Sequence, residues 1–193
     1  LGIRYRWTDQ PPTVASLAEV ICPTLARECE RHNLPPPLLM LEPGRSIIGD
    51  AGITLYRVGV VKEIPGVRTY VAVDGGMSDN PRPALYGAKY EVIVANKASQ
   101  QPTRTVTIAG KHCETDTLVE DVQVPSVETG DILAMPSTGA YTYSMASNYN
   151  RLAKAAVVLV ADGQADLIVR RQTLDEIVAQ DLIPDRLNRR PPA

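Results

Sequence analysis

The sequence lacks phenylalanine altogether and has only two histidines and three cysteines among its 193 residues. His32 and His112 are far apart and form no metal-ligand motif, and the cysteines show no zinc-like spacing. Zinc is therefore not expected. Cys22 and Cys29 fall on one expected helix about two turns apart, too distant for a disulfide, so we interpret both as small buried side chains in a reducing compartment.

Also absent is any long hydrophobic run, because none approaches the ~18 residues that a membrane-spanning helix needs. The first residues lack the charged-then-apolar order of a secretory signal. A formal net charge of -2 gives no basic surplus for binding nucleic acid. With 44% hydrophobic and 22% charged residues, the composition is that of an ordinary globular protein. We expect a cytoplasmic protein with neither a membrane nor a nucleic-acid partner.

The first recognisable elements are a helix and then a short apolar run. Thr13 is placed to cap a helix over residues 14–32, which the prolines at 35–37 end. The run at residues 38–41 predicts a strand covered on both faces. Helix followed by such a strand is typical of an α/β fold, in which the C-terminal ends of the strands collect active-site residues. We therefore assign residues 1–52 to an α/β domain.

The pattern changes after Gly52. Apolar and β-branched runs between turn signals predict strands at residues 53–62, 69–73, 90–94, 103–109, 132–135, 155–160 and 165–170. Asp162-Gly163 is the turn of a hairpin. The spacing predicts an all-β domain over residues 53–193, an antiparallel sandwich or barrel. A short helix at residues 174–180, capped by Thr173, and a frayed tail at 189–193 would follow.

A first motif, suited to binding an anion, follows the apolar run. Glu42, Pro43, Gly44 and Arg45 combine a glycine turn with a guanidinium group that can hold phosphate or carboxylate. Taken alone, a surface turn with an ion pair would explain these residues equally well.

Two further motifs lie in irregular, polar segments. The loop at residues 74–86 contains Arg82 and Tyr86, which could hold a carboxylate. Gly139-Ala140-Tyr141 leads into a segment rich in hydroxyl and amide groups. The ordinary readings are a solvated connection and tyrosines with their hydroxyls at the surface.

A fourth motif sets a thiol beside a carboxylate at an expected strand end, in Gly110-Lys111-His112-Cys113-Glu114. The thiol of Cys113 can pass a proton to a carbanion, and the carboxylate of Glu114 can hold a substrate ammonium. Residue type alone would favour an inert buried thiol.

Together the four motifs occur in the order and approximate spacing seen in diaminopimelate decarboxylases, fold-type III enzymes that depend on pyridoxal 5'-phosphate and make lysine. The resemblance extends over residues 1 to about 183. Asp79-Asn80-Pro81-Arg82-Pro83 separates the sequence from the related ornithine and arginine decarboxylases. The chain is thus similar to the C-terminal portion of a diaminopimelate decarboxylase.

The resemblance implies an α/β barrel that holds the cofactor and a C-terminal β-domain that completes the active site, usually across a homodimer. Residues 1–52 would be the last segments of that barrel and residues 53–193 the all-β domain. The complete enzyme would convert meso-2,6-diaminopimelate to L-lysine and CO2, the last step of lysine biosynthesis.

Individual roles are also implied by the resemblance. Glu42 would contact the pyridine nitrogen of the cofactor, and Pro43, Gly44, Arg45 and Tyr141 would lie at the cofactor, with Gly44, Arg45 and Tyr141 at its phosphate. Substrate would be bound by Arg45, Arg82, Tyr86, Glu114 and Tyr141. Cys113 would donate the proton after decarboxylation, and it would do so, together with Glu114, in the active site of the partner subunit.

Two departures from the family pattern matter. After Cys-Glu the family usually continues Ser-Gly-Asp, whereas this sequence has Thr115-Asp116-Thr117, which predicts an altered turn if the family's turn needs a positive φ. No lysine here matches the one that forms the Schiff base, and the chain starts at Leu1, so we expect a fragment that is inactive alone. Two alternatives stay open: a non-catalytic β-domain that binds a ligand or partner, and a decarboxylase of another basic amino acid, which Arg82 and Tyr86 oppose.

Overall fold

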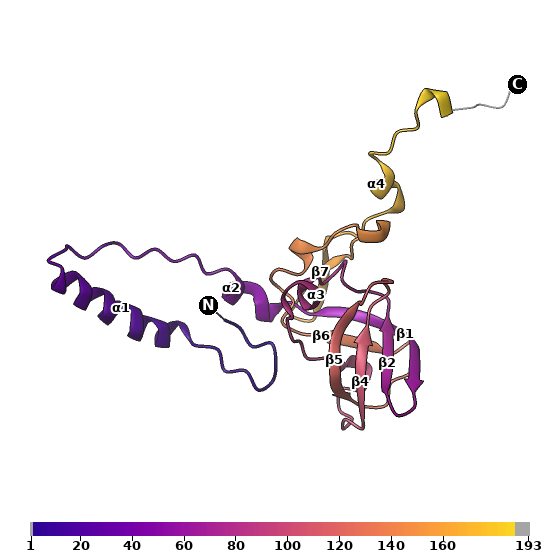
Figure 1. Cartoon of the computed structure of the whole chain (residues 1–193), viewed down its shortest axis with the longest axis horizontal. Coiled ribbons are helices and arrows are strands. Elements are labelled where there is room, and N and C mark those ends of the chain that lie inside the picture. Colours follow the sequence, from indigo (N-terminus) through magenta and orange to yellow (C-terminus); the bar gives the residue numbers. More distant parts are fainter. Residues whose placement is uncertain (1, 188–193) are drawn as a thin grey trace, which may run out of the picture. The chain divides into compact units, whose positions relative to one another are not determined.

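The computed structural model describes residues 2–187 of the chain. The chain divides into two compact units, Leu1–Met145 and Ala146–Ala193. The first unit contains a six-stranded sheet and the second a two-stranded sheet (Figure 1). The chain is therefore mostly β, as predicted, whereas the expected division of the family's domains after residue 52 stays a prediction.

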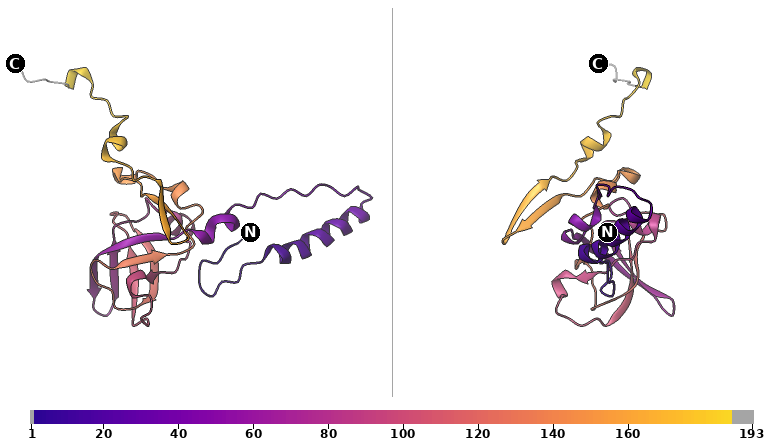
Figure 2. Two further views of the ribbon diagram at one scale, coloured as in Figure 1. Left: turned by 180° about the vertical axis from the view of Figure 1, so that it is seen from behind. Right: turned by 90° about the vertical axis from the view of Figure 1, so that its left-hand side faces the viewer.

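The sheet of the first unit is mixed. Its strands are β1 (Thr54–Ile64), β2 (Arg68–Val73), β3 (Ile93–Val94), β4 (Arg104–Ala109), β5 (Thr117–Val124) and β6 (Ile132–Met135). They lie in the order β3-β6-β1-β2-β4-β5, and the sheet curls, as Figures 1 and 2 show. All neighbours are antiparallel except β2 and β4, so the expectation of a purely antiparallel domain is wrong for this pair. The long connection between these strands returns the chain to the end at which β2 began, which a parallel pair requires.

The core lies on one face of this curled sheet. Along β1 the side chains of Tyr56 and Val58 are buried while those of Leu55 and Arg57 are exposed, the alternation of a strand with one covered face. The same cluster contains side chains from every strand, among them Val71, Val94, Val106, Ile108, Val124, Leu133 and Met135. Each such aliphatic side chain stabilises the fold by about 1.5–3 kcal/mol relative to exposure.

Two strand predictions need adjustment. The strand expected at residues 90–94 is limited to β3, whereas β5 was not predicted. Strand β5 alternates irregularly in burial, and Asp121 within it has a φ of 49°, so its period-2 signal is interrupted. Pairing with β4 supplies the hydrogen bonds that keep this segment extended.

Helix α1 (Val14–Arg31) confirms the predicted helix and its cap, because Thr13 Oγ1 accepts a hydrogen bond from the Ser16 N–H at 3.0 Å. The two helical cysteines differ. Cys29 is buried as expected, but Cys22 is exposed, so the expectation of burial is wrong for Cys22. Seven residues are close to two helical turns, so both cysteines lie on nearly the same side of α1, and their burial differs because Cys29 is the buried residue of a helix whose other residues are exposed or half-buried.

The buried strand predicted at residues 38–41 is wrong. These residues form no strand, and Leu38 and Met40 are 86% and 80% exposed. A strand needs a neighbour for its backbone N–H and C=O groups, and neither sheet of residues 2–187 includes this segment. The apolar side chains of this segment are therefore not buried by the described part of the chain.

The second unit contains the predicted hairpin. Strands β7 (Val157–Ala161) and β8 (Gln164–Val169) pair antiparallel, and Asp162 and Gly163 have φ values of 51° and 75°, as a two-residue primed turn requires. Helix α4 (Leu174–Val178) follows, with Thr173 and Glu176 forming a capping box. The frayed tail expected at residues 189–193 lies outside the described residues. Over residues 2–187, no helix has the length and apolar character needed to cross a bilayer.

Candidate functional site

Arg82 and Tyr86 are placed by a short helix, α3 (Arg82–Tyr86). Prolines at its start fix φ in the first turn, where no backbone hydrogen bond is lost. Gly87 ends it at a φ of 59°, and its N–H donates to the carbonyl of Pro83 at 3.0 Å. A spacing of four residues puts Arg82 and Tyr86 on one helical face, so the guanidinium carbon of Arg82 lies 5.7 Å from the centroid of the Tyr86 ring.

The half-buried guanidinium of Arg82 is surrounded by tyrosines. Its carbon lies 5.6 Å from the ring centroid of Tyr5 and 5.9 Å from that of Tyr141, distances at which a cation is attracted to an aromatic face. Its Nε donates to the hydroxyl of Tyr90 at 3.1 Å. Burial raises the pKa of Tyr90 even though Arg82 opposes the shift, so the hydroxyl stays protonated at neutral pH. These contacts hold Arg82 in one orientation.

Arg45 approaches the ring of Tyr5 from a different element, helix α2 (Arg45–Ile48). Gly44 is the N-cap of this helix. Its Nη1 donates to the Tyr5 hydroxyl at 3.2 Å, and its guanidinium carbon lies 5.6 Å from the centroid of that ring. Its Nε is buried without a hydrogen-bond partner. Tyr5 therefore contacts both arginines, and it packs edge-on against Tyr90 with ring centroids 5.2 Å apart.

We call this group the arginine–tyrosine cluster; it consists of Tyr5, Arg45, Arg82, Tyr86, Tyr90 and Tyr141. The arginine ion pairs of residues 2–187 involve other arginines, so neither Arg45 nor Arg82 is neutralised by a described carboxylate. Two guanidinium groups and several hydroxyls thus face one another, and no described acidic side chain pairs with the arginines. Such a group of hydrogen-bond donors suits an anionic ligand.

Tyr141 reaches the cluster through a close crossing of two backbone segments. The N–H groups of Thr138 and Gly139 donate to the carbonyls of Gly52 and Gly49, each at 3.0 Å. The crossing puts the Tyr141 hydroxyl against Gly44, where a β-carbon would lie only 2.6 Å from it. Tyr141 itself has a φ of 58°, a left-handed conformation that is uncommon outside glycine and clusters at functional sites.

Cys113 and Glu114 lie on a separate loop between β4 and β5. Both side chains are exposed, and the Cys113 Sγ lies 3.6 Å from the Glu114 Oε2 as a weak donor to it. No residue from 110 to 117 has a positive φ, and the expectation that this turn differs from the family's stays a prediction. The replacement of the family's glycine by Thr115-Asp116-Thr117 therefore requires no left-handed residue here.

The remaining sequence-predicted residues, Glu42 and Pro43, lie in exposed coil just before Gly44. The structure thus brings together Gly44, Arg45, Arg82, Tyr86 and Tyr141. Sequence reasoning missed Tyr5 and Tyr90, which hold the two arginines and lie outside the four motifs. Within residues 2–187, no group of three or more His, Cys, Asp or Glu side chains could hold a metal ion.

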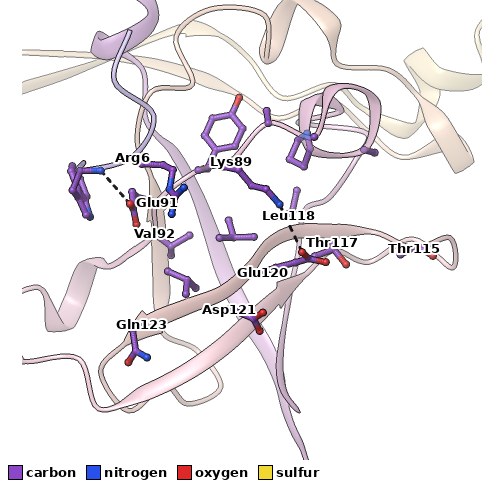
Figure 3. Close-up of a pocket in the computed structure, with 18 of the residues that line it drawn as sticks. Arg6, Lys89, Glu91, Val92, Thr115, Thr117, Leu118, Glu120, Asp121 and Gln123 are labelled. Carbon is purple, nitrogen blue, oxygen red and sulfur yellow. Dashed lines mark hydrogen bonds and ion pairs between the residues drawn. The ribbon is translucent and has the colours of Figure 1, made fainter. Parts of the chain in front are cut away.

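A large groove runs beside β5 and is lined by residues that include Arg6, Trp7, Glu91 and Glu120 (Figure 3). Its volume is about 940 Å³, and an ion pair of 3.8 Å between Lys89 and Glu120 lies along it. None of the sequence-predicted site residues lines this groove. We therefore locate the candidate site by the arginine–tyrosine cluster and the Cys113 loop, whose chemistry is specific, and not by the groove.

Comparison with known proteins identifies the family. Residues 11–139 match the family model of the pyridoxal-dependent decarboxylases, C-terminal sheet domain. Diaminopimelate decarboxylase of Synechocystis sp. is 52% identical over 188 residues, which are 97% of this chain and 40% of that enzyme. The Bacillus subtilis enzyme is 52% identical over 182 residues, 94% of this chain and 42% of its own length.

Solved structures give the same result. The crystal structure of diaminopimelate decarboxylase from M. jannaschii superposes with a TM-score of 0.86 at 38% identity, covering 97% of this chain and 42% of that one. A lysine/ornithine decarboxylase from Vibrio vulnificus, with a TM-score of 0.64 and 22% identity, shares the fold alone.

The chain belongs to the pyridoxal-dependent decarboxylases, as their C-terminal sheet domain. Within that family it is homologous to diaminopimelate decarboxylase, which confirms the resemblance carried by the four motifs. The chain spans about 40% of the length of the curated relatives it matches, namely their C-terminal part.

Proposed function

We propose that this chain is the C-terminal portion of an enzyme that decarboxylates meso-2,6-diaminopimelate to L-lysine and CO2, the last step of lysine biosynthesis. The observation that carries the proposal is the arginine–tyrosine cluster, in which Arg45 and Arg82 share the ring of Tyr5 and lack a described acidic partner. An anionic cofactor and a dicarboxylate substrate are ligands that such a cluster suits. A relative in the family, the M. jannaschii enzyme, has been crystallised with L-lysine.

The residues at Gly44 fit pyridoxal 5'-phosphate. The Arg45 Nε is buried without a partner, and the Tyr141 hydroxyl lies against a residue with no side chain, so both could turn their donors to a phosphate. Glu42 would contact the pyridine nitrogen, beside Pro43. When bound, the cofactor supplies a sink for the electrons left when CO2 departs.

Arg82 and Tyr86 would bind the distal end of the substrate, together with Arg45 and Tyr141. Arg82 can hold the distal carboxylate with two parallel N–H groups, while the Tyr86 hydroxyl, on an exposed ring, can turn to the same group. A decarboxylase of another basic amino acid would have no second carboxylate for Arg82. The retained Arg82–Tyr86 pair therefore favours diaminopimelate.

Cys113 would donate its Sγ proton to the carbon that has lost CO2, and solvent would then reprotonate the thiolate. A thiol is among the side-chain groups that can act as a general acid in such a step. Glu114 would hold a substrate ammonium next to it. We infer a homodimer in which this loop, which is exposed and follows a separate strand, enters the active site of the partner subunit.

The remaining parts of the proposal concern the whole enzyme. Residues 1–52 would end an α/β barrel, and the exposed apolar residues 38–41 support this because a barrel strand needs neighbours on both sides. The Schiff-base lysine would lie outside this chain. Three free cysteines fit a cytoplasmic enzyme.

The experiment uses the complete polypeptide that contains this chain and measures CO2 release from meso-diaminopimelate, lysine, ornithine and arginine. The proposal expects turnover of diaminopimelate and at least about a hundredfold lower kcat/KM for amino acids with one carboxylate, since the unpaired Arg82 would cost about 3 kcal/mol. Equal turnover of lysine or ornithine would reject the substrate. Ligand binding by the complete polypeptide with no CO2 release would favour a non-catalytic binding domain.

A further inference from the structure

The carboxylate of Asp116 lies at the centre of the loop that carries Cys113. Its side chain is 2% exposed. Oδ1 accepts from the Met77 N–H at 2.8 Å, and Oδ2 accepts from the His112 N–H at 3.2 Å. The His112 Nδ1 lies 2.5 Å from the same Oδ2. A buried carboxylate is costly unless several donors surround it, and here the donors come from two loops, Met77 in one and His112 in the other.

The backbone of Asp116 closes the same loop. Its carbonyl accepts from the Gly110 N–H at 2.7 Å, and its own N–H donates to the Glu114 carbonyl at 2.6 Å. Cys113 therefore lies in a turn that is closed by backbone hydrogen bonds of Asp116, one to Gly110 and one to Glu114.

Two glycines leave no free volume around this carboxylate. A β-carbon on Gly76 would overlap Asp116 Oδ2 and lie 2.6 Å from the His112 Nδ1. A β-carbon on Gly110 would overlap the same oxygen and lie 2.6 Å from Oδ1. The N–H of Lys111 also donates to the Gly75 carbonyl at 2.9 Å. The Cys113 loop and the loop at residues 74–80 are thus packed on one another around a single acidic side chain.

We propose that Asp116 is a positioning residue, which fixes the His112–Cys113 turn against the loop at residues 74–80 and thereby sets where the thiol is offered. The proposal rests on the proposed function in one respect, that Cys113 donates a proton. A proton donor must come within about 3 Å of its acceptor, and a displacement of about 1 Å can cost roughly a hundredfold in rate. Because Cys113 is exposed and on a loop, the anchor beneath it decides its position.

The anchor itself can be tested without turnover. In Asp116→Asn the side chain keeps one acceptor where the carboxylate has two, so either orientation turns an NH₂ group toward the Met77 or the His112 N–H. We expect hydrogen exchange of at least one of these amides to speed up by about tenfold or more, the effect of losing one hydrogen bond to a charged group. Asp121→Asn, the same change at an exposed residue five positions later, should leave both rates unchanged. Unchanged exchange of both amides in Asp116→Asn would overturn the anchor.

The action through Cys113 is tested by a double-mutant cycle in the complete enzyme. Asp116→Asn should lower kcat for diaminopimelate by roughly ten- to a hundredfold with KM within about threefold, and the loss should shrink below about threefold in a Cys113→Ala background. An equal loss in both backgrounds would mean a merely structural role and would overturn the proposal.

Two further results keep the outcomes distinct. If Asp116→Asn does not fold, His112→Leu removes the ring contact to Asp116 and leaves both backbone hydrogen bonds to its carboxylate, and it should show the same dependence on Cys113. If Cys113→Ala alone leaves kcat unchanged, the proton-donor part of the proposed function fails, and with it the action of Asp116 through the thiol. The exchange result would still stand as evidence for the anchor.

Discussion

Gly139 crosses Gly52 so closely that the Thr138 N–H donates to the Gly52 carbonyl at 3.0 Å, and a β-carbon on Gly139 would lie 2.9 Å from the Gly52 nitrogen and overlap the carbonyl oxygen of Ile48. Segments almost ninety positions apart in the sequence are thereby joined backbone to backbone. The Tyr141 hydroxyl meets Gly44 because of this crossing.

Gly139→Ala should therefore destabilise the fold and displace Tyr141. The neighbouring atoms are backbone and cannot turn aside, so we expect a loss of about 1–3 kcal/mol in the free energy of unfolding, the usual cost of overpacking. Urea denaturation followed by circular dichroism measures it. Gly59→Ala is the matched control, since its β-carbon would find only the Ala72 carbonyl at 3.7 Å, an ordinary contact. Equal losses in both variants would contradict the crossing.

Tyr5→Phe should weaken the hold on Arg45 while keeping the ring between the two arginines. It removes the acceptor of the 3.2 Å hydrogen bond, for which we expect a loss of about 0.5–1.5 kcal/mol in stability. Tyr5→Leu also removes the aromatic face that Arg45 and Arg82 share, so it should cost more. Thermal denaturation of both variants, with Tyr70→Phe on β2 as control, tests the order; a smaller loss for Tyr5→Leu than for Tyr5→Phe would contradict it.

The stability of the first unit should fall in acid because of Asp131. Burial opposes ionisation of this carboxyl, but hydrogen bonds from Lys97, Asn96 and the Glu128 N–H outweigh it and lower its pKa. A carboxyl whose folded pKa is below its unfolded value of about 3.9 stabilises the fold above that pH. The contribution is lost as the pH falls through the folded pKa. Denaturation midpoints measured between about pH 6 and pH 2 should decline less steeply in Asp131→Asn than in the unmodified protein.

Asp79 supplies the opposite case and serves as the control. Burial raises its pKa, although Lys111 and the Gly76 N–H oppose the shift. Its contribution to stability is therefore present at low pH and lost as the pH rises through its unfolded and then its folded pKa. In Asp79→Asn this loss cannot occur, so the free energy of unfolding should fall less as the pH rises from acid to neutral. If the two variants shift the pH profile in the same direction, the assigned environments of Asp79 and Asp131 are wrong.

Arg82→Lys should raise KM for diaminopimelate in the complete enzyme. A lysine keeps the charge but not the two parallel N–H groups, nor the contact with the Tyr90 hydroxyl. The expected loss is about 1.5–3 kcal/mol, roughly ten- to a hundredfold in kcat/KM. Steady-state kinetics measures it, and Arg57→Lys, an exposed arginine on β1, is the control. An unchanged KM would remove Arg82 from the substrate site.

Local signals in the sequence predicted the elements that depend on local chemistry. Thr13 and Thr173 cap the expected helices, and Asp162-Gly163 turns the expected hairpin. The pairing of distant segments could not be predicted from the sequence. The parallel pair of β2 and β4 was therefore found only in the structure. The run at residues 38–41 shows the limit most clearly, because an apolar sequence predicts burial but cannot say what covers it.

The candidate site divides in the same way. The sequence motifs predicted Arg45, Arg82 and Tyr141 as site residues, because each lies in a glycine- or proline-rich segment and carries a group that can bind a ligand. Tyr5 and Tyr90 gave no signal, because a tyrosine in an ordinary segment is most often a surface or core residue. Their role depends on a contact between segments that are 85 residues apart in the sequence. The structure shows this contact, because the rings of Tyr5 and Tyr90 have centroids 5.2 Å apart.

The most direct test of the central claim is CO2 release from carboxyl-labelled meso-diaminopimelate by the complete polypeptide that contains this chain, with its Cys113→Ala variant measured alongside. We expect release by the complete polypeptide and a fall in kcat of about a hundredfold or more in the variant, the scale at which a general acid contributes. The 193-residue chain alone should release none. Release by this chain alone, or full activity in Cys113→Ala, would contradict the assignment of its residues to one half of a shared active site.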